Sequence, residues 1–238
     1  MNEGIATYII HVDGAQERKA HMDVLLSRHL NLLPTFITDG NIKDLSKSIL
    51  ENYFLGEMKE QKPATSCAYK HFLALKEASK QEGVSLILED DIDFYTSFDE
   101  NLTLITEEIK LQGYNNFIVN LEDSLPRYVA KSIREKGKFL YPKNEMRLAG
   151  AYLVDSIAAK KYVEKIVQDK IHLPTDWFLN TLIQEGSVKC YWSHPVLACQ
   201  KSLSGHFPSL IDQKAYGKFR QLNFWIQKQI KRFKSLFR

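Results

Sequence analysis

The sequence predicts an α/β fold with a Rossmann-like, mixed but mainly parallel sheet, followed by a basic amphipathic helix. Three observations predict this class. Strand-like and helix-like segments alternate from the N-terminus, which is the order that generates parallel strands. A short apolar strand near residue 85 ends in a run of carboxylates, as ligand-binding strands of open sheets do. The last segment combines apolar residues at helical spacing with basic residues and no acid.

The first unit of the sheet is a strand, a helix and a second strand. Residues 6–12 are rich in β-branched and aromatic side chains, which favours a strand. Apolar residues at steps of three and four predict a helix over residues 15–30, and residues 34–38 predict the second strand. The turn after the first strand lacks a Gly-x-Gly-x-x-Gly pattern, so we do not expect glycines to hold a pyrophosphate there.

Three polar residues follow these strands closely. Asp13 and Asp39 come just after strand ends, from where a carboxylate can accept hydrogen bonds from a ribose or base. Arg18, near the start of the helix, can pair with a phosphate or with a nearby acid. We expect the three to hold the nucleoside part of a ligand, although a turn former or a surface ion pair explains each of them equally simply.

The strongest candidate site follows the strand at residues 84–88. Glu89, Asp90, Asp91 and Asp93 place four carboxylates in five positions, and these charges repel one another unless a cation lies among them. Oxygen ligands suit Mg²⁺ or Mn²⁺, which complete their coordination with water and substrate phosphate. The alternative is an acidic turn that only keeps the strand end in water.

The remaining elements alternate in the same manner. A helix capped by Thr65 or Ser66 is expected to precede the acidic strand. We expect an acceptor-side loop over residues 122–143, where the pattern weakens around one short strand. Further helices are expected from 97 to 111, from Ser156 to 170 and from about 175 to 186, and further strands at 116–121, 138–141, 148–154, 189–192 and 196–199.

Four residues in the second half are candidates for chemistry. Asp176 begins a helix, where backbone N–H groups keep a carboxylate ionised, so it can act as a general base or simply cap the helix. Trp177 can stack on a sugar ring or fill the core. Tyr152 is expected beside it in the sugar site. His206, in a polar turn, is a possible metal ligand or phosphate contact, although a lone histidine is often structural.

The chain divides into a body, residues 1–212, and a tail, residues 213–238. The tail carries a charge of +8 and no acid, which leaves the body at −5 from the total of +3. Its apolar stripe and basic face are typical of a helix that binds an anionic membrane surface. A helix docked on the body or on a second subunit is the alternative, and nucleic acid binding is not expected.

The N-terminus shows no signal sequence, and no run is apolar enough for a membrane span. We therefore expect a cytoplasmic protein that is peripheral on the inner face of the cytoplasmic membrane. The three cysteines match neither a zinc motif nor a disulfide framework, so free thiols buried in the interior are expected.

Several of these stretches together resemble glycosyltransferase family 25, over roughly residues 5–205. The matching stretches are Tyr8-Ile9-Ile10-His11-Val12 through Arg18-Lys19, Ser66-Cys67-Ala68-Tyr69-Lys70-His71, Leu86-Ile87-Leu88-Glu89-Asp90-Asp91, Gly150-Ala151-Tyr152-Leu153-Val154 with Ala158-Ala159-Lys160, and Pro174-Thr175-Asp176. The resemblance implies a GT-A type domain and a metal held by the Glu89 to Asp91 element, with Asp93 in reserve. It also places His11 among the donor-binding residues.

The resemblance further implies a UDP-sugar donor, most simply UDP-galactose, with inversion at the anomeric carbon and a lipooligosaccharide or other glycan acceptor. Asp176 is then the base that takes the acceptor's proton. A nucleotidyltransferase and a non-enzymatic membrane scaffold are the alternatives, although the first turn is a poor match for the former. An oligomer is possible.

Overall fold

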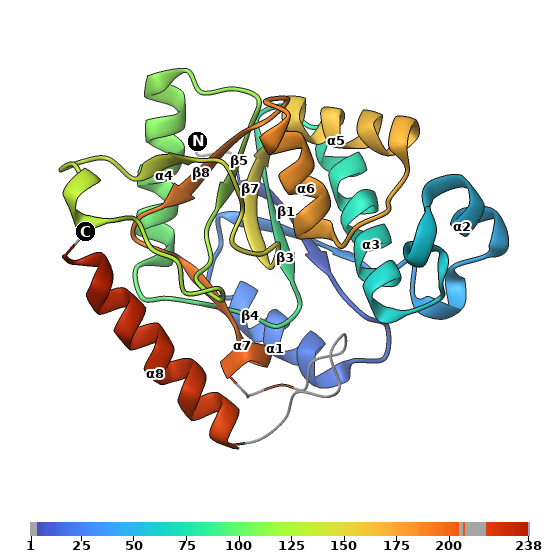
Figure 1. The fold of residues 1–238 in the computed structure, drawn as a ribbon, viewed down its shortest axis with the longest axis horizontal. Helices are drawn as coiled ribbons and strands as arrows, with labels where there is room; N and C mark the ends of the chain where they lie inside the picture. The colour runs from blue at the N-terminus through green and yellow to red at the C-terminus, as the bar shows by residue number, and fades with distance from the viewer. Residues whose placement is uncertain (1–3, 205–206, 208–217, 238) are drawn as a thin grey trace.

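In the computed structural model, seven strands form the central sheet in the order β2-β1-β3-β7-β5-β8-β6 (Figure 1). The structure describes residues 4–204, 207 and 218–237. The strands of this sheet are β1 (Ile5–Ile10), β2 (Leu32–Ile37), β3 (Val84–Glu89), β5 (Phe117–Asn120), β6 (Leu140–Lys143), β7 (Ala151–Asp155) and β8 (Lys189–Ser193).

Five of the seven strands run in the same direction. β1 pairs parallel with β2 and β3, and β5 pairs parallel with β8. β7 lies antiparallel between β3 and β5, and β6 is antiparallel to β8 at one edge. The prediction of a mixed, mainly parallel sheet is therefore confirmed. β3 therefore has one parallel neighbour, β1, and one antiparallel neighbour, β7.

Helices cover both faces of the sheet, so the molecule has three layers (Figure 1). One face packs against α3 (Pro63–Ala78), α5 (Ser156–Asp169) and α6 (Thr175–Gln184), and the other packs against α1 (Gln16–Leu26) and α4 (Phe98–Gln112). The alternation of side chains along β3 divides it between the two cores. Ile87 lies in the first core and Leu86 and Leu88 lie in the second, all of them fully buried.

Two helix starts differ from the sequence prediction. α3 begins at Pro63, whose fixed φ suits the first helical position. Ser66 lies inside that helix, and its hydroxyl donates a 2.7 Å hydrogen bond to the carbonyl of Gly40. α5 is capped by Asp155, whose carboxylate accepts from the N–H of Ala158. A hydroxyl residue near a helix start is thus an ambiguous signal, because it can donate to a carbonyl instead.

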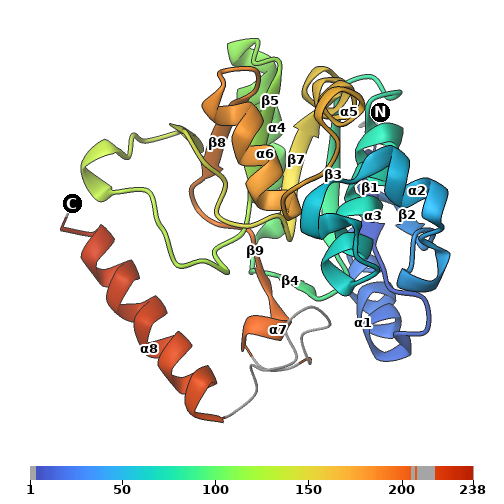
Figure 2. The ribbon, with the colours of Figure 1, turned by 45° about the vertical axis from the view of Figure 1, so that its right-hand side comes forward.

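The remaining elements lie beyond the edges and ends of the sheet. β4 (Ile92–Phe94) and β9 (Ala198–Gln200) form a separate antiparallel pair, so the strand expected near residue 198 does not join the main sheet. Short helices are α2 (Lys47–Tyr53), α7 (Lys201–Ser204) and the 3-10 turns η1 (Ile42–Asp44), η2 (Gly56–Lys59) and η3 (Lys131–Ile133). The predicted C-terminal helix is α8 (Lys218–Ser235), which lies beside the 121–139 segment and off the sheet (Figure 2).

Within the described ranges, no helix has both the length and the apolar content that crossing a bilayer requires. The cysteines form no disulfide: Cys67, Cys190 and Cys199 are free, as expected, and Cys190 is buried.

Candidate functional site

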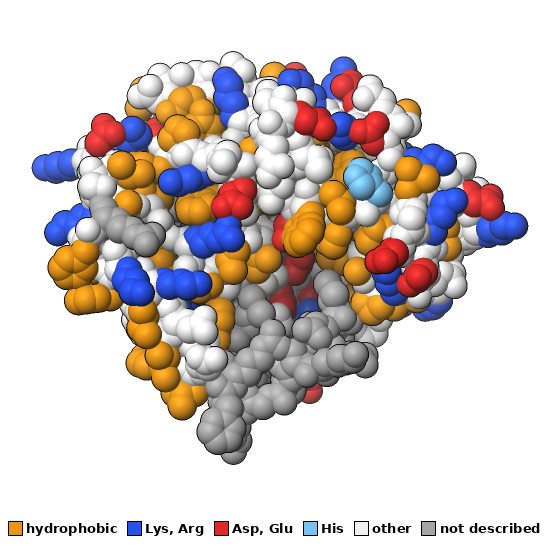
Figure 3. Space-filling view, viewed as in Figure 1, with side chains coloured by type: hydrophobic (Ala, Val, Ile, Leu, Met, Phe, Trp, Pro, Cys, Tyr) orange, Lys and Arg blue, Asp and Glu red, His pale blue; other side chains and the backbone are white. Residues whose placement is uncertain are grey.

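Acidic side chains lie at the bottom of a hollow near the centre of one face (Figure 3). The hollow lies at the carboxyl ends of the parallel strands. β1 and β3 are paired so that Ile10 is opposite Glu89, which makes the residues after them, His11 and Asp90, neighbours. In this way the sheet register brings together candidates that are 79 positions apart in the sequence.

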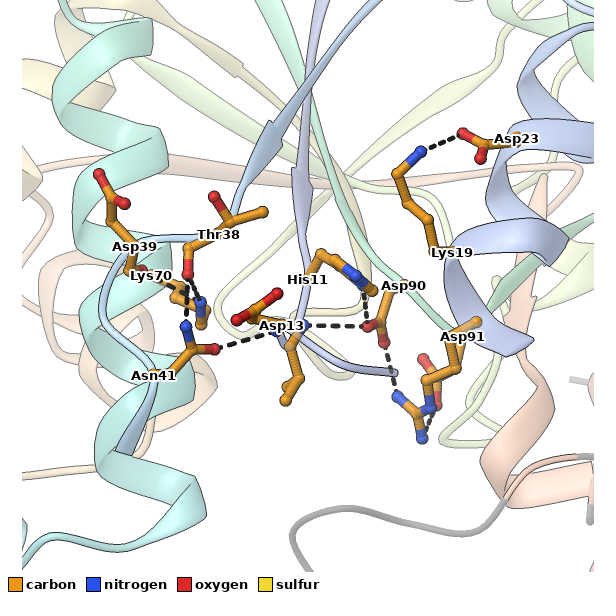
Figure 4. A network of polar contacts seen from close by, with 12 residues as sticks. His11, Asp13, Lys19, Asp23, Thr38, Asp39, Asn41, Lys70, Asp90 and Asp91 are labelled. Atoms are coloured by element: carbon orange, nitrogen blue, oxygen red, sulfur yellow. Dashed lines mark hydrogen bonds and ion pairs between the residues drawn. The ribbon is translucent and has the colours of Figure 1, made fainter. Parts of the chain in front are cut away.

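Asp90 is the centre of a buried polar network (Figure 4). Its Oδ2 lies 2.8 Å from Nδ1 of His11 and accepts from the N–H of Val12, and its Oδ1 accepts from Nη1 of Arg18 at 2.6 Å. All of these side chains are less than a tenth exposed. Asp90 therefore fixes His11 and Arg18 at the entrance to the site, and its two oxygens are already used.

The pKa of Asp90 reflects this network. Burial alone raises the pKa of a carboxyl group. At Asp90 the hydrogen bond with His11 and the charge of Arg18 outweigh burial, so its pKa lies below the ordinary value. An aspartate held ionised in this way is suited to positioning cations rather than to exchanging protons.

Asp91 is in the opposite situation. It is 3% exposed, and its Oδ1 has no hydrogen-bond partner among the described residues. Burial, followed by the charge of Glu89, raises its pKa from 3.8 to about 7, against the attraction of Arg18, whose Nη2 lies 3.9 Å from Oδ2. A buried carboxylate oxygen without a donor costs free energy, and a cation removes that cost.

Glu89, at the end of β3, turns toward α3. Its Oε1 lies 3.4 Å from Nε2 of His71 and 3.8 Å from Sγ of Cys67, and its Oε2 accepts from the side-chain amide of Gln200 at 2.7 Å. The Gln200 side chain fits because Gly150 has no Cβ: one added there would lie 2.6 Å from Nε2 of Gln200. The backbone just before β7 is thus approached closely by Gln200.

Cys67, His71 and Glu89 also form a possible metal-binding group, since their ligand atoms lie within 4.8 Å of one another. Sulfur, nitrogen and oxygen together suit Zn²⁺, whereas carboxylates alone suit Mg²⁺ or Mn²⁺. Glu89 belongs to both possible sets. The partnerless oxygen of Asp91 is the observation that fits a hard cation of the second kind.

The other two metal candidates lie differently. Asp93 is in β4, where its carboxylate accepts from its neighbour's backbone N–H and lies 3.4 Å from Nζ of Lys201. The side chain of Asp93 therefore points toward Lys201, the residue that follows β9. His206 is outside the described residues.

Asp176 lies in the first turn of α6 and is partly exposed. Burial, with a smaller contribution from the charge of Glu89, raises its pKa above the ordinary value, although the backbone N–H of Trp177 opposes the shift. The charge of His71 also affects the pKa of Asp176. Asp176 therefore lies in the same electrostatic environment as the strand-end carboxylates. A carboxylate with a raised pKa, open on one side, can accept a proton from a substrate hydroxyl.

The two aromatic candidates differ in accessibility. Trp177 is 63% exposed, so its ring can meet a ligand. Tyr152 is fully buried, and its hydroxyl lies 3.1 Å from Nδ1 of His71. Any part that Tyr152 has in binding is therefore indirect, through the orientation of the His71 ring.

Asp13 and Asp39 lie on the rim, after β1 and β2 (Figure 4). Both side chains are exposed, and that of Asp13 is 3.5 Å from Nζ of Lys43. Lys70, fully buried on α3, fixes the turn after β2 by donating to the carbonyls of Thr38 and Asp39 at 2.6 and 3.1 Å. Asp13 and Asp39 thus remain open to a ligand, while Lys70 serves the backbone.

Sequence reasoning missed two buried ionisable residues near the site. Glu122 comes just after β5, and its Oε1 accepts from the N–H groups of Gly150 and Ala151. Burial raises its pKa to about 8. Arg147 is 2% exposed and donates to the side chain and carbonyl of Asn120. The repeated Leu-Glu-Asp at the ends of two strands was a signal for Glu122, whereas Arg147 lies in a loop that shows no pattern.

Comparisons with known proteins identify the family of this chain. The model of glycosyltransferase family 25 (LPS biosynthesis protein) matches residues 5–179, which include both carboxylate strands and Asp176. No curated protein matches the chain. Among solved structures, that of mouse xyloside xylosyltransferase 1 in its apo form is similar at 13% identity and a TM-score of 0.35, covering 77% of this chain and 70% of that one. The family match spans well over half of the sequence, and on that ground the chain belongs to glycosyltransferase family 25, in which a sugar passes from a nucleotide-sugar donor to a glycan acceptor.

Proposed function

We propose that this protein is an inverting, metal-dependent hexosyltransferase that moves galactose from UDP-galactose to a lipooligosaccharide or related glycan. The observation that carries the proposal is the buried Asp91, whose partnerless oxygen lies at the carboxyl end of β3 beside Glu89. Ligands of open α/β sheets bind at this edge. Family membership supports glycosyl transfer over nucleotidyl transfer or a purely structural role.

Asp91 and Glu89 are the residues that would hold Mn²⁺ or Mg²⁺. When bound, the ion would neutralise charge on the diphosphate that leaves. His11, Asp13, Arg18 and Asp39 border the pocket from the β1 and β2 side and would hold the nucleoside diphosphate. The ion pair between Arg18 and Asp90 keeps that guanidinium in place before the donor arrives, so little ordering is left for the binding step.

The transfer itself is a single displacement. An acceptor hydroxyl oxygen forms a bond to the anomeric carbon from the face opposite the diphosphate, and the bond from that carbon to the diphosphate oxygen breaks. The bonding electrons leave with UDP, and Asp176 accepts the hydroxyl proton. Trp177, exposed beside Asp176, offers its ring to one of the sugars.

We place the protein on the cytoplasmic face of an anionic membrane, bound through α8. The support is the exposure of apolar residues along that helix, together with the basic charge of the tail. Attraction of each basic residue to an anionic surface is on the order of 1 kcal/mol.

The test is hydrolysis of a panel of UDP-sugars by the purified protein with Mn²⁺, with transfer to a soluble glycan measured in parallel. We expect UDP-galactose to be hydrolysed slowly. Asp91→Asn should lose donor binding and lower transfer by a factor on the order of a thousand, whereas Asp176→Asn should keep donor binding and lose transfer.

Asp23→Asn, an exposed position on α1, is the control and should leave both unchanged. Full transfer by Asp91→Asn in the presence of a chelator would overturn the role of the metal.

A further inference from the structure

A cavity of about 520 Å³ lies between α8 and the body, and it shares no residue with the candidate site. Its walls combine four cationic side chains, two aromatic rings and few other groups. The lining residues are Pro126, Arg127, Tyr128, Ala130, Lys143, Trp192, Lys231, Lys234 and Ser235. A pocket of this composition suits an anion.

The orientation of α8 determines which of its side chains line this cavity. Between residues 222 and 237, Phe224 and Lys228 are half-buried, Ser235 is buried, and all other residues are exposed. The spacing of four and seven places these three residues on one face of the helix. Nζ of Lys228 donates to Asp123 and to the hydroxyl of Tyr95, each at 2.8 Å. This face of α8 therefore lies against the body.

The second anchor of α8 lies near its C-terminal end. Ser235 is 6% exposed, and its hydroxyl accepts from Nη2 of Arg134 at 3.2 Å. With Lys228 and Ser235 both fixed, Lys231 lies between them on the same side of the helix, and Lys234 lies at its margin. The body thus receives the basic side of an amphipathic helix.

The charges of the cavity are largely uncompensated. Arg127 pairs with Glu145. Lys143, Lys231 and Lys234 have no carboxylate within salt-bridge distance among the residues that the structure describes. Three ammonium groups facing one cavity repel each other unless an anion binds among them, and a phosphate with its several acceptor oxygens can contact all three.

The floor of the cavity is an aromatic ring. Trp192 is 6% exposed, its Nε1 donates to the carbonyl of Glu145, and Nζ of Lys143 lies 5.0 Å from its ring centroid. The guanidinium of Arg147 lies 5.1 Å from the same ring. Only a small part of this ring is open to the cavity, and the apolar side of a sugar can contact that part next to its phosphate.

The opposite side of α8 is apolar and open. Trp225, Ile230 and Phe233 are 58%, 47% and 61% exposed. In Figure 3, apolar side chains follow the outer edge of α8, and Lys and Arg side chains gather between the helix and the body. A ligand that has both an acyl portion and a phosphorylated sugar can therefore meet both sides of one helix.

We propose that this cavity binds a phosphate group on the sugar portion of the membrane-anchored glycan acceptor, with Lys143, Lys231 and Lys234 around the phosphate and Trp192 beneath the adjoining ring. The proposal rests on the proposed function, because it names the class of acceptor that the transferase would use: a phosphorylated glycolipid. The headgroup of a bulk anionic phospholipid is the competing ligand that the test must separate.

The experiment measures binding to three kinds of phosphatidylcholine vesicle by sedimentation. The first carries a monophosphorylated glucosamine disaccharide lipid, the second carries the same lipid without phosphate, and the third carries phosphatidylglycerol at matched charge. We expect the first to bind about tenfold more tightly than the third. Lys143→Gln and Lys234→Gln should each weaken binding to the first kind by about fivefold.

Arg232→Gln is the matched control, since it removes one charge from the same turn of α8 but does not line the cavity. It should retain the preference for the phosphorylated sugar. Equal binding to the first and third vesicles, or an equal loss of preference in the Arg232 variant, overturns the proposal. Lys143 is on β6 and not on α8. Weaker binding of the Lys143 variant would therefore show that the cavity itself binds the ligand, in addition to any general attraction through the helix.

Hydrolysis of UDP-galactose without acceptor is measured on the same preparations. It should be unchanged in the lysine variants, because none of these residues belongs to the carboxylate site. Vesicle preference without donor hydrolysis in the unaltered protein would contradict the proposed function alone. Donor hydrolysis without vesicle preference would contradict the acceptor pocket alone.

Discussion

Asp90 determines the shape of the site, although both of its carboxylate oxygens already accept hydrogen bonds from the protein. Its two oxygens contact the side chains of His11 and Arg18, which are buried, and the backbone N–H of Val12. Removing one partner of a buried, hydrogen-bonded charge is costly because the remaining charge loses its main compensation. This network is therefore a stability element as well as a part of the binding site.

We expect Asp90→Asn to lower the free energy of unfolding by about 3 kcal/mol, measured by urea denaturation. Asp23→Asn breaks the exposed ion pair with Lys19 on α1 and should cost less than about 1 kcal/mol. Similar losses in the two variants would show that the Asp90 network adds nothing beyond an ordinary surface pair.

Glu122 predicts a dependence of stability on pH. Burial raises its pKa from 4.5 in the unfolded chain to about 8 in the folded protein. Between these values the folded protein keeps a proton that the unfolded chain has released. The contribution of Glu122 to stability is therefore complete below about pH 4.5, falls as the pH rises toward about 8, and then levels off.

Glu122→Gln should remove the part of the slope that Glu122 contributes, which is at most about 1.4 kcal/mol per pH unit, while its amide oxygen still accepts from Gly150 and Ala151. The raised pKa of Asp91 leaves a slope of the same sign below about pH 7. Urea unfolding at several values between about pH 5 and about pH 8 measures it. Glu107→Gln, the same change at an exposed position on α4, should leave the slope intact. A slope that is as steep in the Glu122 variant as in the unaltered protein would mean that Glu122 does not contribute to it.

Among the elements, β3 could be predicted from the sequence and the helix starts could not. β3 has four apolar residues among the five from Val84 to Leu88 and ends at acidic residues, so its burial on both faces follows from composition. The start of α3 depends on whether a nearby hydroxyl accepts a hydrogen bond from a helix N–H or donates one to another group. Ser66 does the second, because it donates to the carbonyl of Gly40. That choice is made by the turn after β2, which is distant in the sequence.

The helix α8 was predicted from its spacing, and docking on the body was the alternative to membrane binding. Its partners could not be predicted, because Asp123 and Tyr95 carry no signal of a partner more than a hundred positions away. We expect deletion of residues 213–238 to abolish vesicle binding and to leave donor hydrolysis and cooperative unfolding in place. Asp123 keeps hydrogen bonds from Tyr95 and Tyr128 after Lys228 is lost.

Ile226→Gln with Ile230→Gln is the milder variant, since both side chains are exposed and the helix anchors are untouched. It should weaken vesicle binding without changing hydrolysis. Loss of hydrolysis on deletion would instead mean that the helix completes the active site, and vesicle binding that survives deletion would place the membrane contact elsewhere.

At the scale of the whole molecule, the alternation of elements predicted the layers and the main direction of the sheet. It could not predict that β7 and β6 run the other way, since strand direction depends on how long connections cross the sheet rather than on local pattern. The candidate site was located by the acids after β3. Its second wall, made by Cys67, His71 and Gln200, depends on packing between α3 and the end of β9 and has no local signal.

The return of the chain to the carboxylates has a consequence for biosynthesis. Gln200 contacts Glu89 across 111 positions, and the N–H of Lys201 donates to the carbonyl of Asp91 at 2.7 Å. During translation, the early strands can therefore assemble long before these two late partners emerge from the ribosome. Such long-range closure is slow compared with local folding. A nascent polypeptide consequently completes the candidate site only after residues 200 and 201 have left the ribosome.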